Sequence, residues 1–385
     1  MKMIDIQKKQ CTGCAACADV CSKNCIDMSL DSEGFRYPKV NSLTCVNCDL
    51  CKSVCPALNG AEYDTLAETY AVKSNDEKVR FESSSGGAFS QIAKYILNNG
   101  GIVFGAAFDD DWTVHHIAVD SEGDLRLLRT SKYTQSRMHG IYRQVKKKLK
   151  EGYKVLFTGT PCQVNALKLF LKEDYDNLTL VDFICHGVPS ETVWKKYTDF
   201  ISAGKTIQNI NFRDKPESWS RYSVTVGFDD ESKYSCTFNS DPYMKLFLSD
   251  YILRPACYNC PSKTPNRSSD ITLADLWGAR EIKDNIDDDK GLSMVILNTD
   301  KGKRVFESVS DSVTAEKIDY SKAIAHNPSA VHSVGIPKNR DKVLNDIFRI
   351  DNPDFAHIAR KYDYSNKFTN KIKRKLKYAL KTLLK

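Results

Sequence analysis

The chain has 385 residues, of which 41% are hydrophobic and 27% charged, and its formal net charge is +7 at pH 7. This length predicts two or three domains with packed cores, and no run of about 18 apolar residues is present to span a bilayer. The excess of positive charge lies from Lys367 to the end, so the body is close to neutral and lacks the basic face of a nucleic-acid enzyme. We therefore expect no nucleic-acid partner.

Nine of the fourteen cysteines lie in the first 55 residues, and eight of them repeat the spacing C-x2-C-x2-C-x3-C. The two copies are Cys11, Cys14, Cys17 and Cys21, and Cys45, Cys48, Cys51 and Cys55. In such a motif three close thiolates bind three irons of one cubane, and the fourth binds the other cluster. We therefore predict two [4Fe-4S] clusters, one on Cys11, Cys14, Cys17 and Cys55 and one on Cys45, Cys48, Cys51 and Cys21.

Disulfides and zinc explain this motif less well. The start of the chain lacks the apolar segment of a secretory signal, so an oxidising compartment is not expected. A zinc site normally uses two C-x2-C pairs and would leave cysteines over. Residues 1–60 resemble a bacterial-type two-cluster ferredoxin, an α+β module, although Ser22 stands where that family usually has proline. Cys25 is expected to be a buried thiol beside a cluster, and the protein to be cytoplasmic.

From Glu68 onward, strand-like and helix-like stretches alternate. Strands are predicted over residues 68–74, 101–108, 115–119, 154–158, 178–184, 223–228, 271–274 and 293–298, and helices over 87–98, 142–150 and 161–171. This alternation is typical of an α/β domain with a mainly parallel or mixed sheet. We assign residues 61–335 to this larger domain.

A second group of cysteines follows predicted strand ends in this domain. In Lys154–Gln163 a strand leads into a helix, with Thr160 as N-cap and Pro161 at the first helical position. Cys162 then lies in the first turn, where free N–H groups favour a thiolate or another anion. The other members of the group are Cys185, Cys257 and Cys260. Four thiolates suffice for a third cluster or a structural zinc, and plain buried thiols are the remaining alternative.

Six ordered motifs make a family resemblance specific. They are SSSGGAFSQIAKYI (83–96), SKYTQS (131–136), GTPCQ (159–163), CHGVPS (185–190), RPACYNCP (254–261) and SDITLADLWG (269–278). Together they resemble the beta-subunit family of coenzyme F420-reducing hydrogenases and dehydrogenases, from about residue 68 to 335. The resemblance implies that the domain binds FAD. It also implies that Cys162, Cys185, Cys257 and Cys260 hold a third [4Fe-4S] cluster, which some members carry.

The expected flavin contacts come from three places in the sequence. Ser84, Ser85, Gly86 and Gly87 open a helix with exposed N–H groups, a site suited to a pyrophosphate, and otherwise are only a helix start. The other predicted contacts are Lys132, Tyr133, Thr158, Gly159 and Thr160. An ordinary exposed loop is the alternative for the first two of these. Asp275 and Trp277 are expected first to pack at a strand end.

His186 could relay a proton beside a cluster or flavin, because its pKa lies near neutrality. It could equally bond a backbone carbonyl beside Gly187.

The C-terminal segment, residues 336–385, is predicted to be helical. Its basic tail has an apolar stripe at helical spacing: Phe368, Ile372, Leu376, Ala379, Leu380, Leu383 and Leu384. Such a helix can lie on an anionic membrane surface, which would place the protein at the periphery of the inner membrane, or pack on its own protein.

Taken together, the sequence predicts an iron–sulfur flavoprotein oxidoreductase. It would pass electrons between a hydride donor or acceptor at FAD and a one-electron partner through its clusters, because cubanes accept one electron at a time. Coenzyme F420 or an organic substrate could supply or take the hydride. The alternatives are a non-catalytic electron-transfer subunit of a larger redox complex and a ferredoxin-dependent reductase of an organic substrate.

Overall fold

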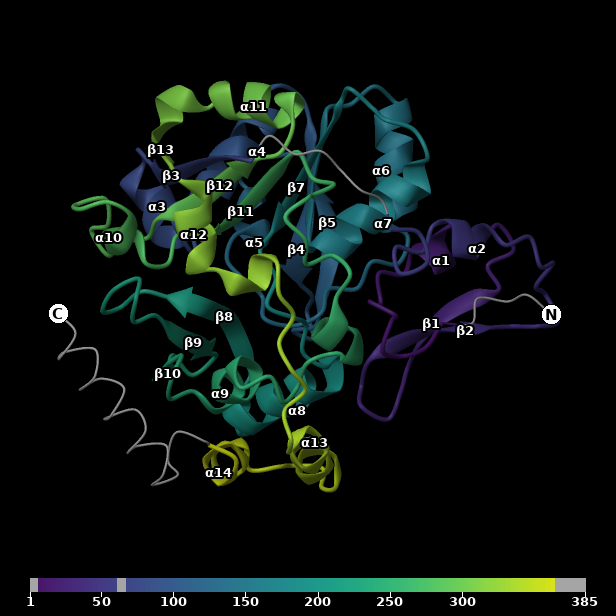
Figure 1. Ribbon diagram of the computed structural model, residues 1–385. Coiled ribbons are helices and arrows are strands. Elements are labelled where there is room, and N and C mark those ends of the chain that lie inside the picture. Colours follow the sequence, from purple (N-terminus) through teal and green to yellow (C-terminus); the bar gives the residue numbers. More distant parts are fainter. Residues whose placement is uncertain (1–5, 61–66, 364–385) are drawn as a thin grey trace.

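The computed structural model describes residues 6–60 and 67–363, and the predicted basic tail from Lys367 lies outside them. A small N-terminal module with the duplicated cysteine motif packs beside α6 and α7 of a larger α/β body with a mixed sheet (Figure 1). Among the described helices, none is long and apolar enough to cross a bilayer.

The N-terminal module consists of one hairpin and two single-turn helices. Strands β1 (Ile26–Leu30) and β2 (Arg36–Val40) pair antiparallel, and α1 (Ala16–Asp19) packs against α2 (Leu50–Ser53). Each helix begins after a residue with left-handed backbone, at Ala15 (φ 64°) and Asp49 (φ 59°). Equivalent positions of the two cysteine runs thus share the same unusual backbone, as expected for two loops that wrap similar groups.

The body is built on an eight-stranded sheet of order β13-β3-β12-β11-β7-β6-β4-β5. Its strands are β3 (Glu68–Ser74), β4 (Ile102–Phe108), β5 (Val114–Val119), β6 (Val155–Gly159), β7 (Leu178–Phe183), β11 (Ile271–Asp275), β12 (Ser293–Leu297) and β13 (Val313–Ile318). The central strands β4, β6, β7 and β11 are parallel, whereas β5, β12 and β13 pair antiparallel with their neighbours. The carboxyl ends of β3, β6, β7 and β11 therefore meet at one edge, where α/β proteins place their sites.

Helices cover both faces of this sheet. They are α3 (Glu77–Glu82), α4 (Ala88–Asn98), α5 (Leu125–Leu128), α6 (Ile141–Lys150), α7 (Pro161–Leu171), α10 (Ala279–Ile282), α11 (Asp300–Glu307) and α12 (Tyr320–Ala325), with 3-10 turns η2 (Ser310–Ser312) and η3 (Pro328–Ala330). One core lies between the sheet and α4, with Ile92 and Val103 buried. The core under α6 and α7 continues into the N-terminal module, where Ala16 and Val54 belong to it. Module and body therefore share one hydrophobic core.

A second, smaller layer lies across the carboxyl edge of the large sheet (Figure 1). It contains α8 (Glu191–Ser202), the antiparallel strands β8 (Ile207–Asp214), β9 (Ser223–Phe228) and β10 (Lys233–Thr237), α9 (Pro242–Leu248), η1 (Pro255–Asn259), α13 (Arg340–Phe348) and α14 (Phe355–Lys361). Its core is rich in buried aromatic residues, including Trp194, Tyr197, Phe212 and Tyr243. Aromatic burial contributes much of the stability of so small a layer.

The sequence predicted the large sheet better than this layer. Strands 68–74 and 223–228 and helix 161–171 are confirmed residue for residue, and the other predicted elements end within about two residues of the observed ones. The elements β8, β10, β13, α8 and α9 were not predicted. β8 reads IQNINFRD with an irregular burial pattern, so it lacks the alternation of a half-buried strand.

Candidate iron–sulfur and cofactor site

The first predicted thiol set lies at the junction of the module and the body. Cys11, Cys14, Cys17 and Cys55 are all buried. Burial, then the proximity of Cys11, Cys55 and Cys51, raises the pKa of the Cys17 thiol to about 12. The pKa of Cys14 is raised in the same way, by burial and then by its thiol neighbours Cys17, Cys11 and Cys55. Free thiols crowded so closely suit a metal group that replaces their protons.

The second thiol set surrounds a cavity at the far end of the module. Cys21, Cys45, Cys48 and Cys51 all line it, together with Cys25, Ile26 and Val40. Cys25 is buried, with its sulfur 3.3 Å from that of Cys21, as expected for a thiol beside a cluster. The hydrogen bond with Cys21, and then burial, raises the pKa of Cys25 to about 12. Cys48 is solvent-exposed, so this set lies at the molecular surface.

The third set brings together cysteines from three elements. Cys162 lies in the first turn of α7, and Cys185 follows β7. Cys257 belongs to η1, and Cys260 is the first residue after this turn. Burial, and then the neighbouring thiols of Cys260 and Cys257, raises the pKa of Cys162 to about 12. The pKa of Cys185 is raised by burial and then by the other three thiols. The fold thus gathers four thiols that could hold a cluster.

Local hydrogen bonds orient this third set. The amide of Val188 donates to Cys257 Sγ (3.4 Å), and Thr160 Oγ1 lies 3.1 Å from Cys162 Sγ. Such hydrogen bonds to sulfur tune an iron–sulfur cluster. Across the described ranges, no three His, Cys, Asp or Glu side chains are grouped tightly enough to hold a single metal ion.

A buried arginine that sequence reasoning missed connects the first and third sets. Arg254 is fully buried and is the N-cap of η1, the turn that carries Cys257. Its guanidinium donates to the carbonyls of Cys11 (2.6 Å) and Arg36 (2.7 Å) and to Gln135 Oε1 (2.9 Å). Its Nη2 also lies 3.7 Å from Cys11 Sγ. A fixed positive charge therefore stands between the two groups of thiols.

The segment Ser84–Gly87 lies at the carboxyl edge of the sheet, but its polar groups are engaged differently from the prediction. The amide of Gly86 donates to Ser293 Oγ (2.9 Å), and Ser85 Oγ donates to the carbonyl of Leu292 (2.8 Å). A Cβ on Gly86 would lie 2.2 Å from the carbonyl oxygen of Val72. This glycine therefore permits close packing on β3 and β12. Gly87 (φ 90°) begins α4 as its N-cap.

The predicted flavin contacts Ser84, Lys132 and Tyr133 are brought together. Ser84 Oγ accepts a hydrogen bond from the amide of Ser131 (2.8 Å), the residue before Lys132. Lys132 Nζ donates to the carbonyls of Leu127 (2.9 Å) and Arg129 (2.7 Å). Burial lowers the pKa of Lys132 to about 7. The loop is thus folded inward rather than extended into solvent.

Two cations at the end of β8 complete this region, Arg213 on the strand and Lys215 directly after it, and neither was predicted. Arg213 is buried, pairs with Asp275 (3.0 Å), and donates to the carbonyl of Ser84 (3.1 Å) and to Tyr133 Oη (3.2 Å). Lys215 Nζ donates to the carbonyls of Arg80 (2.8 Å) and Lys290 (3.1 Å). Burial, and then the charges of Arg213 and Arg80, lowers the pKa of Lys215 to about 8. The charges of Lys132 and Lys215 meet no carboxylate within 4 Å among the described residues, so the region suits an anion.

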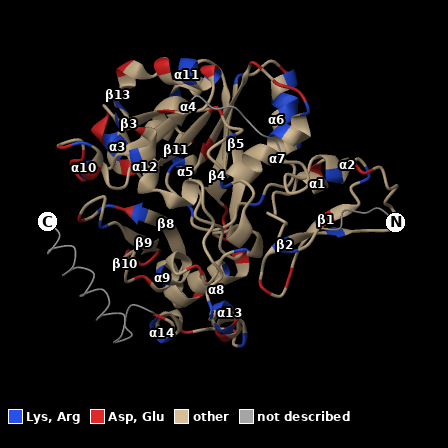
Figure 2. Cartoon of the chain, viewed as in Figure 1, with Lys and Arg blue, Asp and Glu red and all other residues tan. Residues whose placement is uncertain are grey.

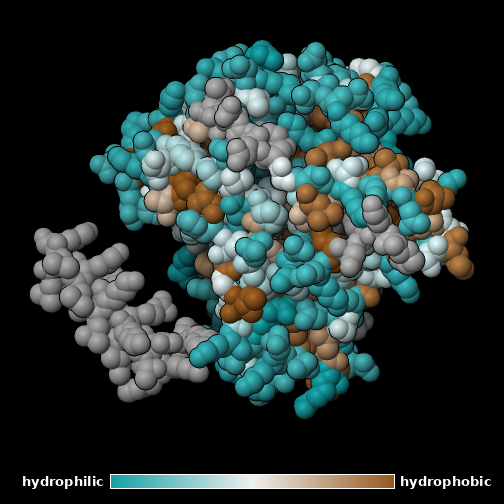
Figure 3. Space-filling view, turned by 45° about the vertical axis from the view of Figure 1, so that its right-hand side comes forward, coloured by the Kyte–Doolittle hydropathy of each residue, from teal (hydrophilic) through white to brown (hydrophobic). Residues whose placement is uncertain are grey.

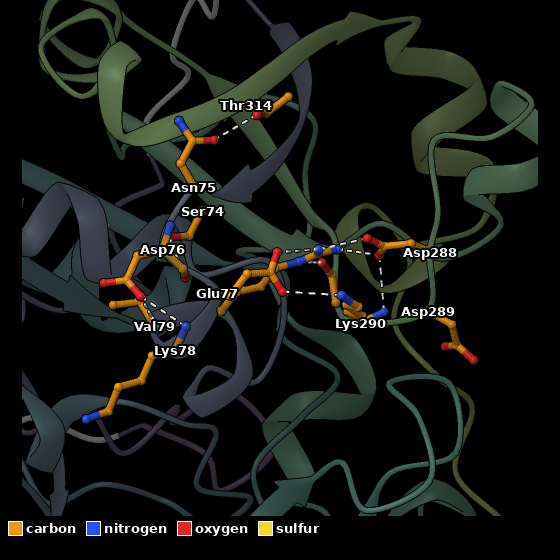
Figure 4. A network of polar contacts seen from close by, with 12 residues as sticks. Ser74, Asn75, Asp76, Glu77, Lys78, Val79, Asp288, Asp289, Lys290 and Thr314 are labelled. Atoms are coloured by element: carbon orange, nitrogen blue, oxygen red, sulfur yellow. Dashed lines mark hydrogen bonds and ion pairs between the residues drawn. The ribbon is translucent and has the colours of Figure 1, made fainter.

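A polar network holds the loop that supplies the carbonyl of Lys290 (Figure 4). Lys290 Nζ lies 3.4 Å from Glu77 at the start of α3, and Arg80 donates to Asp288 (2.8 Å). Asp288 in turn accepts from the amide of Lys290 (3.3 Å). The loop is therefore fixed against α3, and the position of Lys215 with it.

Of the three predicted contacts on this turn, Thr160 lies against Cys162 of the third thiol set, whereas Thr158 bonds to β4 and Gly159 is the buried last residue of β6. Thr158 Oγ1 donates to the carbonyl of Phe104 (3.1 Å), which ties β6 to β4. Thr160 is the N-cap of α7 and Pro161 its first residue, as predicted, and Thr160 also forms a capping box with Gln163. Asp275 forms the ion pair with Arg213, and Trp277 stacks on Trp219 with centroids 4.7 Å apart.

His186 follows Cys185 and pairs with a carboxylate rather than with a backbone carbonyl. Its Nε2 lies 2.6 Å from Asp250 Oδ1, and its Nδ1 lies 3.5 Å from Ser329 Oγ. The carbonyl of His186 accepts from Lys263 (3.0 Å). An Asp–His pair beside the third thiol set could hold or move a proton at Nδ1.

Family models match both the module and the body. Residues 69–142 match the family model for the N terminus of the coenzyme F420 hydrogenase/dehydrogenase beta subunit, and residues 152–322 match the model for its C terminus. Residues 10–59 match the 4Fe-4S dicluster domain. The two beta-subunit models together cover most of the body, and the dicluster match supports iron–sulfur clusters in the module.

Among curated proteins, the chain is 22% identical over 318 residues to coenzyme F420-dependent sulfite reductase of Methanocaldococcus jannaschii. The match covers 80% of this chain but 48% of that protein, so the chain spans about half the length of this relative. Among solved structures, a chain of the F420-reducing [NiFe] hydrogenase complex from Methanosarcina barkeri is similar, with 15% identity and a TM-score of 0.46. That match covers 74% of this chain and 93% of the hydrogenase chain.

Proposed function

Because this chain belongs to the coenzyme F420 hydrogenase/dehydrogenase beta subunit family, we propose that it is an iron–sulfur flavoprotein oxidoreductase. Its three thiol sets would hold three [4Fe-4S] clusters, and the region around Lys132, Arg213 and Lys215 would bind FAD. A flavin exchanges two electrons with a hydride carrier and single electrons with clusters, which makes it the converter between the two.

The single observation that carries this proposal is the order of the thiol sets. The third set lies in the body at the strand ends. The ring of Phe247 lies between Tyr133 of the candidate flavin region and His186, the residue after Cys185, with centroid distances of 5.2 and 5.1 Å. Arg254 connects it to the first set, at the junction with the module. The second set, which includes Cys21 and Cys51, lies at the outer end of the module and reaches the surface at Cys48. This order suits electrons that pass between a buried flavin and an outside partner.

The charges of the candidate flavin region support an anionic cofactor. Lys132 and Lys215 are held by carbonyls, and burial of each cation lowers its pKa. The pyrophosphate of FAD would compensate these charges, since a buried charge without a counter-ion is costly. Ser84 and Tyr133 are fixed by Arg213 at the same place and would orient the ligand.

The hydride partner is proposed at the level of chemical class. Coenzyme F420 is one candidate, since the sulfite reductase relative uses it by name, and an organic substrate is the other. His186, held by Asp250, would hold or deliver the proton that accompanies hydride chemistry at this edge. We also place the protein in the reducing cytoplasm, which thiolate-bound clusters require. Contact of the tail with the inner membrane stays a prediction.

The test is to purify the chain anaerobically and measure iron, acid-labile sulfide, zinc and flavin on one sample. The proposal expects about twelve irons and one FAD per chain with no zinc, since each cubane contains four irons. About eight irons without flavin, even after reconstitution, would leave a non-catalytic electron-transfer subunit. If FAD is present, reduction by a deazaflavin or by nicotinamide hydride donors then separates the candidate hydride classes.

A further inference from the structure

The outer end of the N-terminal module has an apolar surface around its cysteines. Cys48 is exposed, and the neighbouring side chains of Leu43 and Val46 are 94% and 59% exposed. All three belong to the segment between β2 and α2, and Val46 lines the cavity of the second thiol set. Figure 3, with this side of the molecule turned forward, shows hydrophobic residues on the module. Large apolar side chains so exposed beside a functional group indicate a contact surface.

Basic side chains border this surface on one side. A hollow of about 410 Å³ adjoins the cavity of the second thiol set and shares Cys21, Ser22 and Leu50 with it. Its lining includes the cations Arg143, Lys146 and Lys172. Two of these cations come from α6, which carries several Lys and Arg residues (Figure 2). On the other side of Cys21, Lys23 lines the cavity itself.

Of these cations, only Arg143 has a carboxylate partner among the described residues, in a long ion pair with the fully buried Asp19 (4.0 Å). Asp19 also accepts hydrogen bonds from the amides of Gly140 (2.6 Å) and Tyr142 (3.0 Å). Within residues 6–60 and 67–363, no carboxylate lies within 4 Å of the ammonium groups of Lys23, Lys146 or Lys172. By contrast, Lys147 and Lys148 on the same helix pair with Glu151. The excess positive charge therefore lies at the border of the hollow.

We propose that this face docks a small acidic one-electron carrier protein. The proposal rests on the proposed function, because the second thiol set must hold a cluster. An apolar centre with a charged rim is typical of transient interfaces, where the rim charges steer the encounter. A basic rim selects an acidic partner, and the basic residues that follow Lys367 carry the same sign as the rim.

The electron count of each encounter is simple. In each encounter one electron would move between the carrier and the second cluster, so that one is oxidised as the other is reduced, with no bond made or broken. Two successive encounters would account for the two electrons of one hydride exchanged with the substrate, and one proton would be released to or taken up from solvent. The exposed Cys48 places this cluster where a docked partner would approach it most closely.

The test measures electron transfer by stopped flow between the anaerobic holoprotein and a chemically reduced acidic two-cluster ferredoxin. The variant Lys146→Glu/Lys172→Glu reverses two rim charges, and the control Lys322→Glu reverses one exposed charge on α12, on the opposite side of the body. We expect the second-order rate of the double variant to fall ~10-fold at low salt, with the control unchanged. The wild-type rate should also fall steeply as salt screens the rim.

Reduction by dithionite and iron content must be equal in all three proteins, so that a loss of rate reports docking. Equal rates for the double variant and the control would overturn the proposal. So would a double variant that loses binding to anionic phospholipid vesicles while its rate with ferredoxin stays unchanged, since the rim would then face a membrane. Failure of the proposed function is distinct: the iron of the second cluster would be missing before any carrier is added.

Discussion

The substitution Arg254→Met tests whether the buried guanidinium controls the first cluster. Arg254 Nη2 lies 3.7 Å from Cys11 Sγ, so its charge should stand roughly 6 Å from the centre of a bound cubane, where at an effective dielectric constant of about 20 it contributes ~3 kcal/mol. A positive charge stabilises the reduced, more negative state of a cluster. Its removal should therefore lower the reduction potential by about 130 mV, since 59 mV corresponds to a factor of ten, or about 1.4 kcal/mol, for one electron.

The same substitution should also destabilise the junction between module and body. It leaves the carbonyls of Cys11 and Arg36 and the amide of Gln135 without their donor. Each unsatisfied buried acceptor costs about 1–3 kcal/mol, so we expect a loss of several kcal/mol in the free energy of unfolding. Methionine fills much of the space, which limits any added cavity.

The assay is a redox titration followed by electron paramagnetic resonance, on samples with full iron content. Arg254→Lys is the matched control, because it keeps the charge but loses the planar fork. It should retain most of the potential and lose part of the stability. Potentials of Arg254→Met within about 20 mV of the wild-type values for every cluster would refute the electrostatic reasoning, since that shift is far below the expected one.

Three further predictions concern single sites. Cys48→Ser should abolish or convert the second cluster while flavin stays bound, and loss of flavin with that cluster intact would contradict the assignment of the module. Cys257→Ser/Cys260→Ser should lower iron by about four per chain; unchanged iron and sulfide would return these cysteines to a structural role. Burial lowers the pKa of Lys132 to about 7, so between pH 7 and its ordinary value of 10.5 the unfolded chain binds more protons there. The free energy of unfolding of the apoprotein should thus gain a rising contribution with pH in this window, and Lys132→Met should lose it in denaturant titrations at several pH values.

The parts of the site that follow from local spacing were predictable from the sequence. The intervals between the cysteines identify the two cluster motifs. In GTPCQ, Thr160 followed three residues later by Gln163 has the spacing of a capping box. An apolar run such as Val155–Gly159 predicts a strand that is buried on both faces of a parallel sheet, and β6 is such a strand. Each of these inferences needs only a few neighbouring residues.

The parts that depend on distant contacts were not predictable. Arg254 contacts Cys11, 243 positions earlier in the chain, and nothing in RPACYNCP indicates that partner. Arg213 lies on β8 and Lys215 directly follows it, and the irregular burial pattern of this strand lacks the alternation by which it could have been predicted. Gly86 looks like a glycine for anion approach, yet its neighbours are β3 and β12, which only the tertiary fold brings there.

The way the module is fixed to the body bears on how electrons must travel. The carboxylate of Asp19 in the module accepts hydrogen bonds from the amides of Gly140 and Tyr142 at the start of α6. In turn, Tyr142 Oη donates a hydrogen bond to the carbonyl of Cys14 (2.9 Å). Ion pairs add to this, with Arg36 to Glu191 (2.8 Å) and Arg340 to Glu33 (2.6 Å).

Contacts of this kind, on top of a shared hydrophobic core, oppose the domain rotation by which some redox proteins carry a cluster between partners. The first thiol set should therefore stay at a fixed distance from the third set, and transfer between them needs no conformational step. Only the second set, at exposed Cys48, is left to meet a partner that arrives from solution, so the rim charges around it should govern the rate of exchange with that partner.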